Sequence, residues 1–420
     1  MTTDPNKSQP IPKALIVIGG GAAGFFCAIN GARLSPGLQV TILEKTGKLL
    51  SKVKVSGGGR CNVTNALFDI VEMSRRYPRG QHFVKKTFHQ FFTTDTIEWF
   101  EERGIKLKAE KDGRMFPATD SSQTIIDCLM QEAGRYGVDI RTGTEVKSIL
   151  RDAGKFVLEA SNQTSAVCDY LCVATGGFPK AAMWDWLRQL GHAVEEPVPS
   201  LFTFNLPKHP INALMGVSVE KVRIKIEGSK LMEEGPVLIT HWGLSGPAVL
   251  RLSAWGAKEL SNLNYQFKVF INWLPDFNDQ TLKAEFQHLR RTDAKKKISN
   301  VNPGLPARLW DFLIQHSGVE HDLRIADLPA GLENILIRNI LNYAVEVRGK
   351  TTFKEEFVTA GGITLSVVDA NTMMSKKITN LFFAGEVLNV DGITGGFNFQ
   401  HAWTSGWIAA RSIASIANRE

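Results

Sequence analysis

Cysteine is scarce in this sequence, and its spacing suits neither a disulfide framework nor a metal site. The 420 residues include five cysteines, an odd number without a C-x-x-C pair: Cys27, Cys61, Cys128, Cys168 and Cys172. Disulfide-dependent domains are short and rich in cysteine, and structural zinc sites use closely paired cysteines. We therefore expect no disulfide framework, no metal site and a reducing, cytoplasmic setting.

Long apolar runs are also missing. The longest, residues 14–29, is interrupted by four glycines, so we expect no transmembrane helix. The leader MTTDPNKSQPIPK is polar and lacks the apolar segment of a signal peptide. No internal repeat and no low-complexity linker interrupts the chain. These absences predict a protein without a membrane partner.

The composition is that of a globular protein with a modest positive charge. Hydrophobic residues make up 43% of the chain and charged residues 22%, and the length allows two or three domains. The formal net charge of +7 fits partners that carry phosphate, either a dinucleotide or a nucleic acid. A small positive excess also simply aids solubility, and the total alone favours that second interpretation.

The N-terminal region predicts a βαβ unit. Residues 14–18, ALIVI, form a short apolar run rich in β-branched side chains, as in a strand buried on both faces of a parallel sheet. The sequence GGGAAG follows, then a helix over 25–34 and a second strand over 39–43. Further helices are predicted over 93–103 and 122–136, and a further strand over 170–174.

The pattern of hydrophobic and polar residues changes near residue 198. Strand-like stretches at 219–226, 237–240 and 266–271 indicate a β-rich insert, and residues 280–350 are helical and charged. Strand character returns at 357–365 and 380–384, before a last helix over 402–417. The pattern predicts one α/β domain that is interrupted by an insert and completed by the C-terminus.

The sequence Gly19-x-Gly21-x-x-Gly24 is a dinucleotide fingerprint. It lies between a predicted strand and a predicted helix, where a pyrophosphate can meet the N-terminal end of the helix. Glu44 ends the second strand, where a carboxylate can accept from ribose hydroxyls. It favours an unphosphorylated adenosine ribose, and hence NAD or FAD. Lys45 is either a solvated neighbour or a contact to the exterior of the ligand.

Further glycine clusters favour FAD over NAD. They lie at 56–60, 174–177, 360–362 and 385–396. Each cluster alone is typical of an ordinary turn. Together with the fingerprint they predict several close approaches of backbone to a buried flavin ring, where N–H groups stabilise negative charge.

Seven motifs together resemble the BaiN/RdsA-type, or YhiN-like, NAD(P)/FAD-dependent oxidoreductases. They cover nearly the whole chain in order: GGGAAG, KVSGGGRCNVTN, GRMFPATDSSQ, ATGG, THWGLSGPAVL, VTAGGI and AGEVLNVDGITGGFNFQHA. The resemblance implies an α/β fold. The implied fold contains a Rossmann-like FAD-binding domain of the two-dinucleotide-binding-domain flavoprotein type, an inserted β-barrel-like domain and a small helical domain.

The expected organisation places the FAD-binding domain at 1–197 and 366–420. The β-rich insert occupies 198–275 with a return segment at 351–365, and the helical domain occupies 276–350.

The expected cofactor contacts lie in the glycine-rich segments and at the end of the second strand. They are Gly19, Gly21, Ala22, Ala23, Gly24, Glu44, Lys45, Gly57, Gly58, Gly59, Arg60, Asn62, Ala174, Thr175, Gly176, Gly385, Glu386, Gly392, Gly395, Gly396, Phe397 and Asn398. By the resemblance, Gly57 to Gly59 lie against the flavin ring, and Arg60 and Asn62 supply polar contacts.

Two residues are candidates for proton transfer. Cys61 is either a thiol packed beside the flavin or a proton donor. His241 is either a structural histidine before a turn or a catalytic one facing the flavin, and we interpret His401 as structural or capping. Related sequences commonly read LDVDG where this chain has Asn389, so a catalytic role for that carboxylate is in doubt here.

Three functions remain open. The first is NAD(P)H-driven reduction of an activated C=C bond with FAD, in a small molecule or in uridine of large-subunit ribosomal RNA. A transient NADH or NADPH would serve as donor, because the chain has no second dinucleotide fingerprint. Basic segments at 75–79, 85–86, 290–291 and 295–297 would suit RNA, although each is also typical of a solvated helix face. The alternatives are an aminoacetone-type amine oxidase and an RNA- or ribosome-binding flavoprotein with structural FAD. The oligomeric state is not predicted.

Overall fold

The fold is known from a computed structural model, which describes residues 12–161, 163–178, 180–352 and 358–419. The chain forms two compact units, divided after residue 198 and after residue 353. The first unit therefore joins the N-terminal and C-terminal parts of the sequence, and the second is an insert between them. No helix of the described residues is long and apolar enough to cross a membrane.

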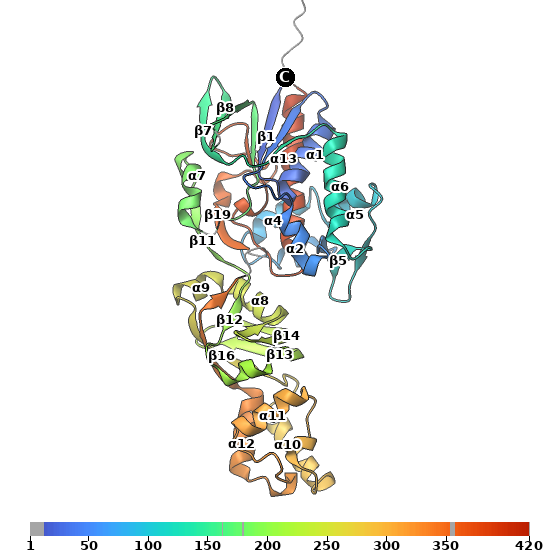
Figure 1. The fold of residues 1–420 in the computed structure, drawn as a ribbon, viewed down its shortest axis with the longest axis vertical. Coiled ribbons are helices and arrows are strands. Elements are labelled where there is room, and N and C mark those ends of the chain that lie inside the picture. Colours follow the sequence, from blue (N-terminus) through green and yellow to red (C-terminus); the bar gives the residue numbers. More distant parts are fainter. Residues whose placement is uncertain (1–11, 162, 179, 353–357, 420) are drawn as a thin grey trace, which may run out of the picture. The chain divides into compact units, whose positions relative to one another are not determined.

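A five-stranded parallel sheet organises the first unit (Figure 1). Its strand order is β20 (Leu381–Phe383), β10 (Tyr170–Val173), β1 (Ala14–Ile18), β2 (Gln39–Leu43) and β6 (Asp139–Arg141). Helix α1 (Ala22–Leu34) connects β1 to β2 and packs against the C-terminal helix α13 (Phe397–Ala417). The predicted βαβ unit is confirmed, and α13 begins five residues earlier than predicted.

The remaining elements of the first unit surround this sheet. The helices are α2 (Ser51–Gly59), α3 (Ile70–Ser74), α4 (Gln81–Phe88), α5 (Thr93–Glu101), α6 (Ser122–Arg135) and α7 (Asp185–Gln189). Two small antiparallel sheets join β3 (Thr64–Asn65), β5 (Arg114–Pro117) and β4 (Leu107–Ala109), and β7 (Val146–Asp152), β8 (Lys155–Ala160) and β9 (Ser165–Cys168). Strand β11 (Val194–Pro199) pairs with β19 (Thr359–Ile363).

The second unit contains a curled antiparallel sheet. Its order is β17 (Tyr343–Arg348), β16 (Gln266–Asn272), β13 (Ser218–Ile226), β14 (Met232–Thr240), β15 (Gly243–Ser245), β12 (Thr203–Asn205) and β18 (Lys350–Thr351). The two edge strands, β17 and β18, are separated in the chain by Gly349 alone. Opposite edges of the sheet are therefore brought together, which gives the barrel-like form that the resemblance implied.

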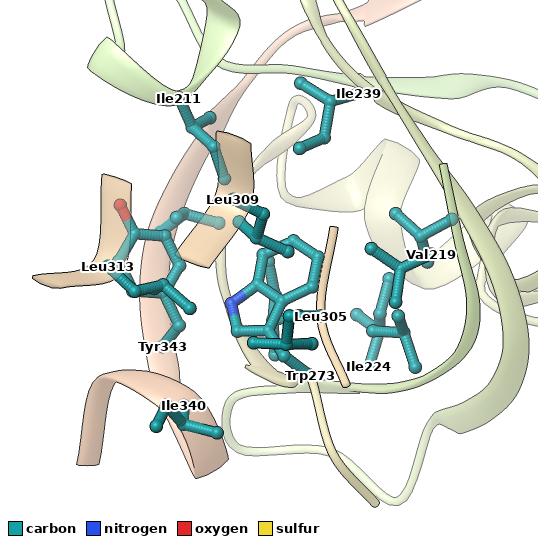
Figure 2. Close-up of a cluster of buried hydrophobic side chains, with 14 of the residues drawn as sticks. Ile211, Val219, Ile224, Ile239, Trp273, Leu305, Leu309, Leu313, Ile340 and Tyr343 are labelled. Carbon is teal, nitrogen blue, oxygen red and sulfur yellow. The ribbon is translucent and has the colours of Figure 1, made fainter. Parts of the chain in front are cut away.

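The helices of the second unit share one hydrophobic core with this sheet. They are α8 (Pro247–Trp255), α9 (Ala257–Asn262), α10 (Asp279–Thr292), α11 (Ala307–His316) and α12 (Ala330–Leu341). Figure 2 shows Trp273 packed among Leu305, Leu309 and neighbouring side chains from helices and strands. Because the core is continuous, residues 279–341 form a helical layer on the barrel-like sheet.

Two predicted boundaries differ from the structure. Residues 343–348 were predicted as helix, but they form β17, in which Tyr343, Val345 and Val347 alternate inward. That period of two is the signature of a half-buried strand. Residues 351–365 were predicted as the return of the insert. Of these, β19 pairs with β11, and its glycines lie in a fully buried strand of the first unit.

Candidate functional site

The first glycine loop is shaped by contacts within the protein at two of its three glycines. A Cβ on Gly24 would lie 1.9 Å from the carbonyl oxygen of Gly19, and a Cβ on Gly19 would lie 2.4 Å from that of Ala174. Both contacts are with backbone, which cannot move away as a flexible side chain can. The loop therefore joins β1, the start of α1 and the end of β10 at one point.

Gly21 differs from Gly19 and Gly24, because no contact among the described residues requires a glycine at this position. A Cβ there would meet no atom within 4 Å, and its φ of −95° suits any residue. Gly21 is the N-cap of α1 and makes no side-chain hydrogen bond to the helix start. Open space at an uncapped helix N-terminus fits the close approach of a pyrophosphate.

Glu44 is held beside this loop. Its Oε2 accepts from the backbone N–H of Gly20 at 2.9 Å, and its Oε1 accepts from the N–H and the hydroxyl of Thr46, each at 2.9 Å. A carboxylate has further acceptor sites on each oxygen, so ribose hydroxyls can still donate to it. Lys45 is exposed, with its ammonium 5.7 Å from the ring centre of Phe178, as expected for a solvated neighbour.

The second glycine cluster ends helix α2. Gly57, Gly58 and Gly59 all have positive φ, at 59°, 70° and 86°. A Cβ on Gly57 would lie 2.7 Å from the ring of Phe116, so this glycine is needed for packing. Gly58 and Gly59 are exposed and face open space, and their backbone is available to a ligand.

Cys61 lies directly after this cluster and is enclosed by protein. Its exposed fraction is 0%, and its φ is 63°. Burial raises the pKa of the thiol to about 12, while a hydrogen bond with Ser56 lowers it slightly. A thiol sealed in this way cannot reach a substrate, so the structure favours the packing interpretation of Cys61 over the proton donor.

The two predicted polar contacts after the cluster are already engaged by the protein. The guanidinium of Arg60 donates to Glu110 at 2.7 Å and lies 4.0 Å from the ring centre of Phe116. The Asn62 amide is oriented by its hydrogen bonds, with its oxygen accepting from the N–H of Gly396 at 2.9 Å. Both side chains therefore position the backbone of the site, and any contact to a cofactor is additional.

The segment 62–65 is fastened to the C-terminal glycine loop and helix α13. Asn65 donates to the carbonyl of Gly395 at 2.9 Å, and Thr64 donates to the Gln400 side chain at 2.6 Å. The indole N–H of Trp403 donates to the carbonyl of Val63 at 2.9 Å. The two sequence motifs that carry most of the resemblance thus form one hydrogen-bonded piece.

Glycines of the C-terminal loop are required mainly by protein contacts. A Cβ on Gly385 would lie 2.7 Å from Ala23, and one on Gly392 or Gly395 would lie 2.6 Å from Phe397. A Cβ on Gly396 would lie 2.4 Å from the carbonyl oxygen of Thr64.

The side chain of Asn398 closes the same loop. It accepts from the N–H of Gly392 at 2.8 Å and donates to the carbonyl of Gly392 at 2.9 Å. Phe397 is buried, and its carbonyl accepts from Tyr77 at 2.6 Å. Both residues therefore shape the loop.

The glycines at 360–362 were expected to lie close to the flavin, and the structure gives two of them a reason in protein packing. A Cβ on Gly361 would lie 2.5 Å from the carbonyl of Glu196, and one on Gly362 would lie 2.6 Å from that of Val387. These glycines let β19 pack between two other backbone segments. At 174–177, Ala174 is buried behind Gly19. A Cβ on Gly176 would meet one atom within 4 Å, a carboxylate oxygen of Glu386 at 3.9 Å.

Glu386 links three parts of the first unit. It forms an ion pair with Lys52 of α2, and it accepts from the N–H of Thr359 at 2.8 Å. Neither the ion pair nor the strand contact was predicted, because both partners are distant in sequence.

The candidate histidines occupy opposite environments. His241 is exposed at the turn between β14 and β15, and its ring lies 4.2 Å from that of Trp242. His401 is 2% exposed in α13, with Nε2 3.3 Å from the carbonyl oxygen of Gly385. Burial lowers the pKa of His401 to about 4, so the ring is neutral near pH 7. The structural interpretation of His401 agrees with this placement.

Sequence reasoning missed an ion pair at the C-terminal loop. Two guanidinium nitrogens of Arg79 donate to the two carboxylate oxygens of Asp391, which is 0% exposed. A Cβ on Gly80 would also lie 2.6 Å from Val390. The sequence signal that could have predicted this pair is Asp391 itself, the carboxylate at the start of DGITGG, since a buried charge needs a partner.

The residues of the first unit fit a flavin dinucleotide. Gly21 and the start of α1 would hold the pyrophosphate, Glu44 the adenosine ribose, and the open backbone at Gly58 and Gly59 the ring. Among the described residues, no group of three or more His, Cys, Asp or Glu side chains could hold a metal ion.

Comparisons with known proteins agree with this geometry. The sequence pattern described as "HI0933-like protein Rossmann domain" matches residues 13–412. The chain is 32% identical over 408 residues to "Ribosomal RNA dihydrouridine synthase" of Escherichia coli (strain K12), covering 95% of this chain and 97% of the relative. It is 29% identical over 407 residues to "3-dehydro-bile acid delta(4,6)-reductase" of Clostridium scindens, covering 95% and 98%.

A solved structure shares the fold at low sequence identity. The 3-ketosteroid-delta4-(5alpha)-dehydrogenase from Rhodococcus jostii RHA1, in complex with 4-androstene-3,17-dione, superposes with a TM-score of 0.51. It is 14% identical, and the match covers 98% of this chain and 99% of that one. At this identity the likeness shows a shared fold alone.

Proposed function

The chain belongs to the HI0933-like Rossmann-domain family and is a FAD-dependent oxidoreductase, and we propose that it reduces an activated C=C bond with NADH or NADPH. We further propose that its acceptor is uridine in large-subunit ribosomal RNA, which it converts to dihydrouridine.

One observation carries the proposal. Two relatives that match 95% of this chain, at 32% and 29% identity, are named for one type of reaction, although their substrates differ greatly in size. Dihydrouridine synthesis and bile-acid Δ4,6 reduction both add two hydrogens across a C=C bond conjugated to a carbonyl. The reaction class is therefore better supported than the substrate. Uridine is preferred because the relative named for it has the higher identity.

FAD, once bound and reduced by NADH or NADPH, would supply a hydride to the electron-poor carbon of such an acceptor, and a separate group would supply a proton. The residues of this chain act on binding and position. The Gly19–Gly24 loop and Glu44 hold the dinucleotide half, and the backbone at Gly58 and Gly59 lets a ring approach closely. A nicotinamide donor would bind transiently, since one fingerprint serves one dinucleotide.

His241 is the proton donor in this proposal. Its imidazole is exposed, while the thiol of Cys61 is sealed and has a pKa raised to about 12. Trp242, beside it, donates to Thr203 at 3.1 Å, which fixes the turn that carries the histidine. A positioned acid contributes about 100-fold or more to such a step.

The first test is made in cells that lack the gene. Mass spectrometry of their large-subunit ribosomal RNA should show a missing dihydrouridine, and a plasmid copy should restore it. Unchanged dihydrouridine in the deletion strain would contradict the RNA substrate. A steroid enone and a quinone as alternative acceptors for NADPH oxidation would then test the reaction class separately.

A second test separates the enzyme classes. The purified flavoprotein should oxidise NADH or NADPH faster once uridine-containing RNA is added. Peroxide from aminoacetone without nicotinamide would instead indicate an amine oxidase. RNA binding with FAD that stays oxidised under both conditions would indicate a binding protein with structural FAD.

The proton donor is tested by two substitutions. His241→Gln should leave flavin reduction by NADPH intact and lower acceptor turnover by about 100-fold. Cys61→Ala should leave both rates within about threefold of the unmodified enzyme, because the thiol has no access to substrate. Equal turnover in His241→Gln and the unmodified enzyme would exclude His241.

A further inference from the structure

Residues 73–94 carry basic charge without any acidic residue. The stretch contains Arg75, Arg76, Arg79, Lys85 and Lys86, and neither aspartate nor glutamate. It includes helix α4 and the turn before it. An acid-free stretch of this kind is a candidate surface for a polyanion.

Helix α4 divides cleanly into a buried and a basic face. Phe83, Val84, Thr87 and Phe88 are buried. The four exposed positions, His82, Lys85, Lys86 and His89, are spaced i, i+3, i+4 and i+7, and so lie on one side of the helix. The outer face of α4, defined by these four residues, therefore carries two lysines and two histidines and no acidic side chain.

Acidic side chains do not neutralise this face. Across the part of the chain that the structure describes, none of its four residues forms an ion pair, and neither does Arg76. Two acidic residues flank the stretch in sequence: Glu72 of α3 pairs with Arg75, and the carboxylate of Asp95 in α5 accepts from the N–H of Phe92 at 2.6 Å. The positive charge of Lys85 and Lys86 is thus available to a ligand.

The basic segment of the second unit, residues 290–297, differs because several of its cations have acidic partners. Arg290 pairs with Glu333, Lys296 with Asp293 at 2.8 Å, and Lys297 with Asp322 at 2.7 Å. Its charges are partly balanced by neighbours, as on an ordinary solvated helix surface. The two segments look alike in sequence, but they differ at their adjacent lysines: Lys296 and Lys297 are both paired, whereas Lys85 and Lys86 form no ion pair among the described residues.

The turn before α4 is fastened to the C-terminal glycine loop. Arg79 holds Asp391, Tyr77 donates to the carbonyl of Phe397, and the N–H of Ile393 donates to the carbonyl of Arg76 at 3.0 Å. The basic face and the 391–397 loop therefore belong to one rigid piece of the first unit. A polyanion held on α4 has a fixed relation to that loop.

An exposed aromatic side chain lies close by in sequence. Phe68 is 58% exposed and precedes α3, which packs against α4. Exposed aromatic rings beside basic residues are typical of surfaces that bind unpaired bases by stacking.

We propose that the outer face of α4 binds the phosphate backbone of the RNA substrate. The inference rests on the proposed function, and it assigns the RNA contact to the first unit. Charge complementarity selects RNA as the occupant: the face has cations without acids, an exposed ring nearby in sequence, and a rigid link to the C-terminal glycine loop.

The test uses the full-length FAD-loaded protein and fluorescence anisotropy with a labelled transcript of large-subunit ribosomal RNA. Lys85→Glu combined with Lys86→Glu should weaken binding at least about tenfold. The slope of log affinity against log salt should decrease by about 1.5, because two phosphate contacts are lost. Lys85→Gln with Lys86→Gln should give an intermediate loss.

The matched control is Lys296→Glu with Lys297→Glu, an adjacent exposed pair with the same change of charge. It should alter RNA affinity less than about threefold, because these lysines are already balanced. The visible flavin spectrum and the thermal midpoint of each variant show that fold and cofactor are retained.

The outcomes separate this inference from the proposed function. If the unmodified protein binds the transcript and both charge-reversed pairs weaken binding equally, the α4 assignment is overturned while the RNA substrate stands. If the unmodified protein does not bind the transcript at all, both fail. Binding of anionic phosphatidylserine vesicles without RNA binding would also overturn the assignment.

Discussion

The two glycine-rich loops at the ends of the first unit look alike in sequence and have different reasons for their glycines. In the N-terminal loop, Gly21 faces open space, whereas its neighbours Gly19 and Gly24 contact backbone. In the C-terminal loop, added Cβ atoms at Gly392 and Gly396 would lie 2.6 Å and 2.4 Å from protein atoms. One loop keeps space for a ligand, and the other uses glycine to pack protein on protein.

This difference limits what a glycine cluster can indicate. A cluster predicts that something approaches the backbone, but the sequence does not say whether that is a cofactor or another segment of the chain. The comparison can be tested by adding single methyl groups, since Gly→Ala places a Cβ at a known position. The expected effects on folding free energy differ widely among the sites.

The largest effect is expected at Gly24. Gly24→Ala should prevent accumulation of folded, soluble protein, because the methyl group would lie 1.9 Å from the Gly19 carbonyl oxygen and both groups are backbone. The measurement is soluble yield and the circular dichroism spectrum. Gly37→Ala, at an exposed position with no atom within 4 Å, is the control and should fold normally. Normal folding of Gly24→Ala would show that the helix start shifts easily.

The next effect is expected at Gly396, in the C-terminal loop. Its φ is 90°, and a Cβ would lie 2.4 Å from the Thr64 carbonyl oxygen. Gly396→Ala should lower the free energy of unfolding by more than about 3 kcal/mol, from strain and overpacking together. Urea denaturation should show the same loss with and without FAD. A loss seen only with FAD would assign this glycine to the ligand.

Local sequence patterns predicted the parts of the fold that depend on local interactions. The β1–α1–β2 unit, the fingerprint and Glu44 follow from periodicity and short spacings, and the structure places them together. The partners of the other glycines could not be predicted, because Thr64 and Gly396 are 332 residues apart. Strand β17 was missed because helix α12, directly before it, masks the change of period.

The sequence predicted which segments form the candidate site, but it did not predict which contact each side chain makes there. Arg60, Glu386 and Asn398 were assigned to the cofactor, and the structure shows what else they do: they hold Glu110, Lys52 and Gly392. Such roles depend on which distant side chain lies opposite. Cys61 was left open because burial cannot be read from a loop sequence.

A smaller effect, confined to acid pH, is expected at His401 beside the C-terminal loop. Its pKa is lowered to about 4 in the fold from an ordinary value of 6.5, so between these values the unfolded chain binds more protons. Stability should therefore fall as the pH drops from 6.5 toward 4, by roughly 1.4 kcal/mol per pH unit from this group. The loss should be absent above pH 6.5.

The measurement is urea denaturation of the unmodified protein and of His401→Gln across that pH range. His401→Gln should show a shallower decline, since glutamine does not titrate and can still donate to the Gly385 carbonyl. His82→Gln, on the exposed face of α4, controls for the loss of any histidine. Parallel declines in the unmodified protein and His401→Gln would mean that other groups dominate.

The smallest effect on folding, and the sharpest contrast with Gly24 and Gly396, is expected at Gly21. Gly21→Ala should lower the unfolding free energy of the apoprotein by no more than about 1 kcal/mol, the cost of alanine at an N-cap, because its Cβ would meet no described atom within 4 Å. The same methyl group should obstruct a pyrophosphate that approaches the helix start, so FAD binding should weaken strongly. Urea denaturation of the apoprotein and titration with FAD, followed by visible absorbance, measure the two quantities separately. A variant that binds FAD as tightly as the unmodified protein would show that the open space at Gly21 is not where the dinucleotide lies.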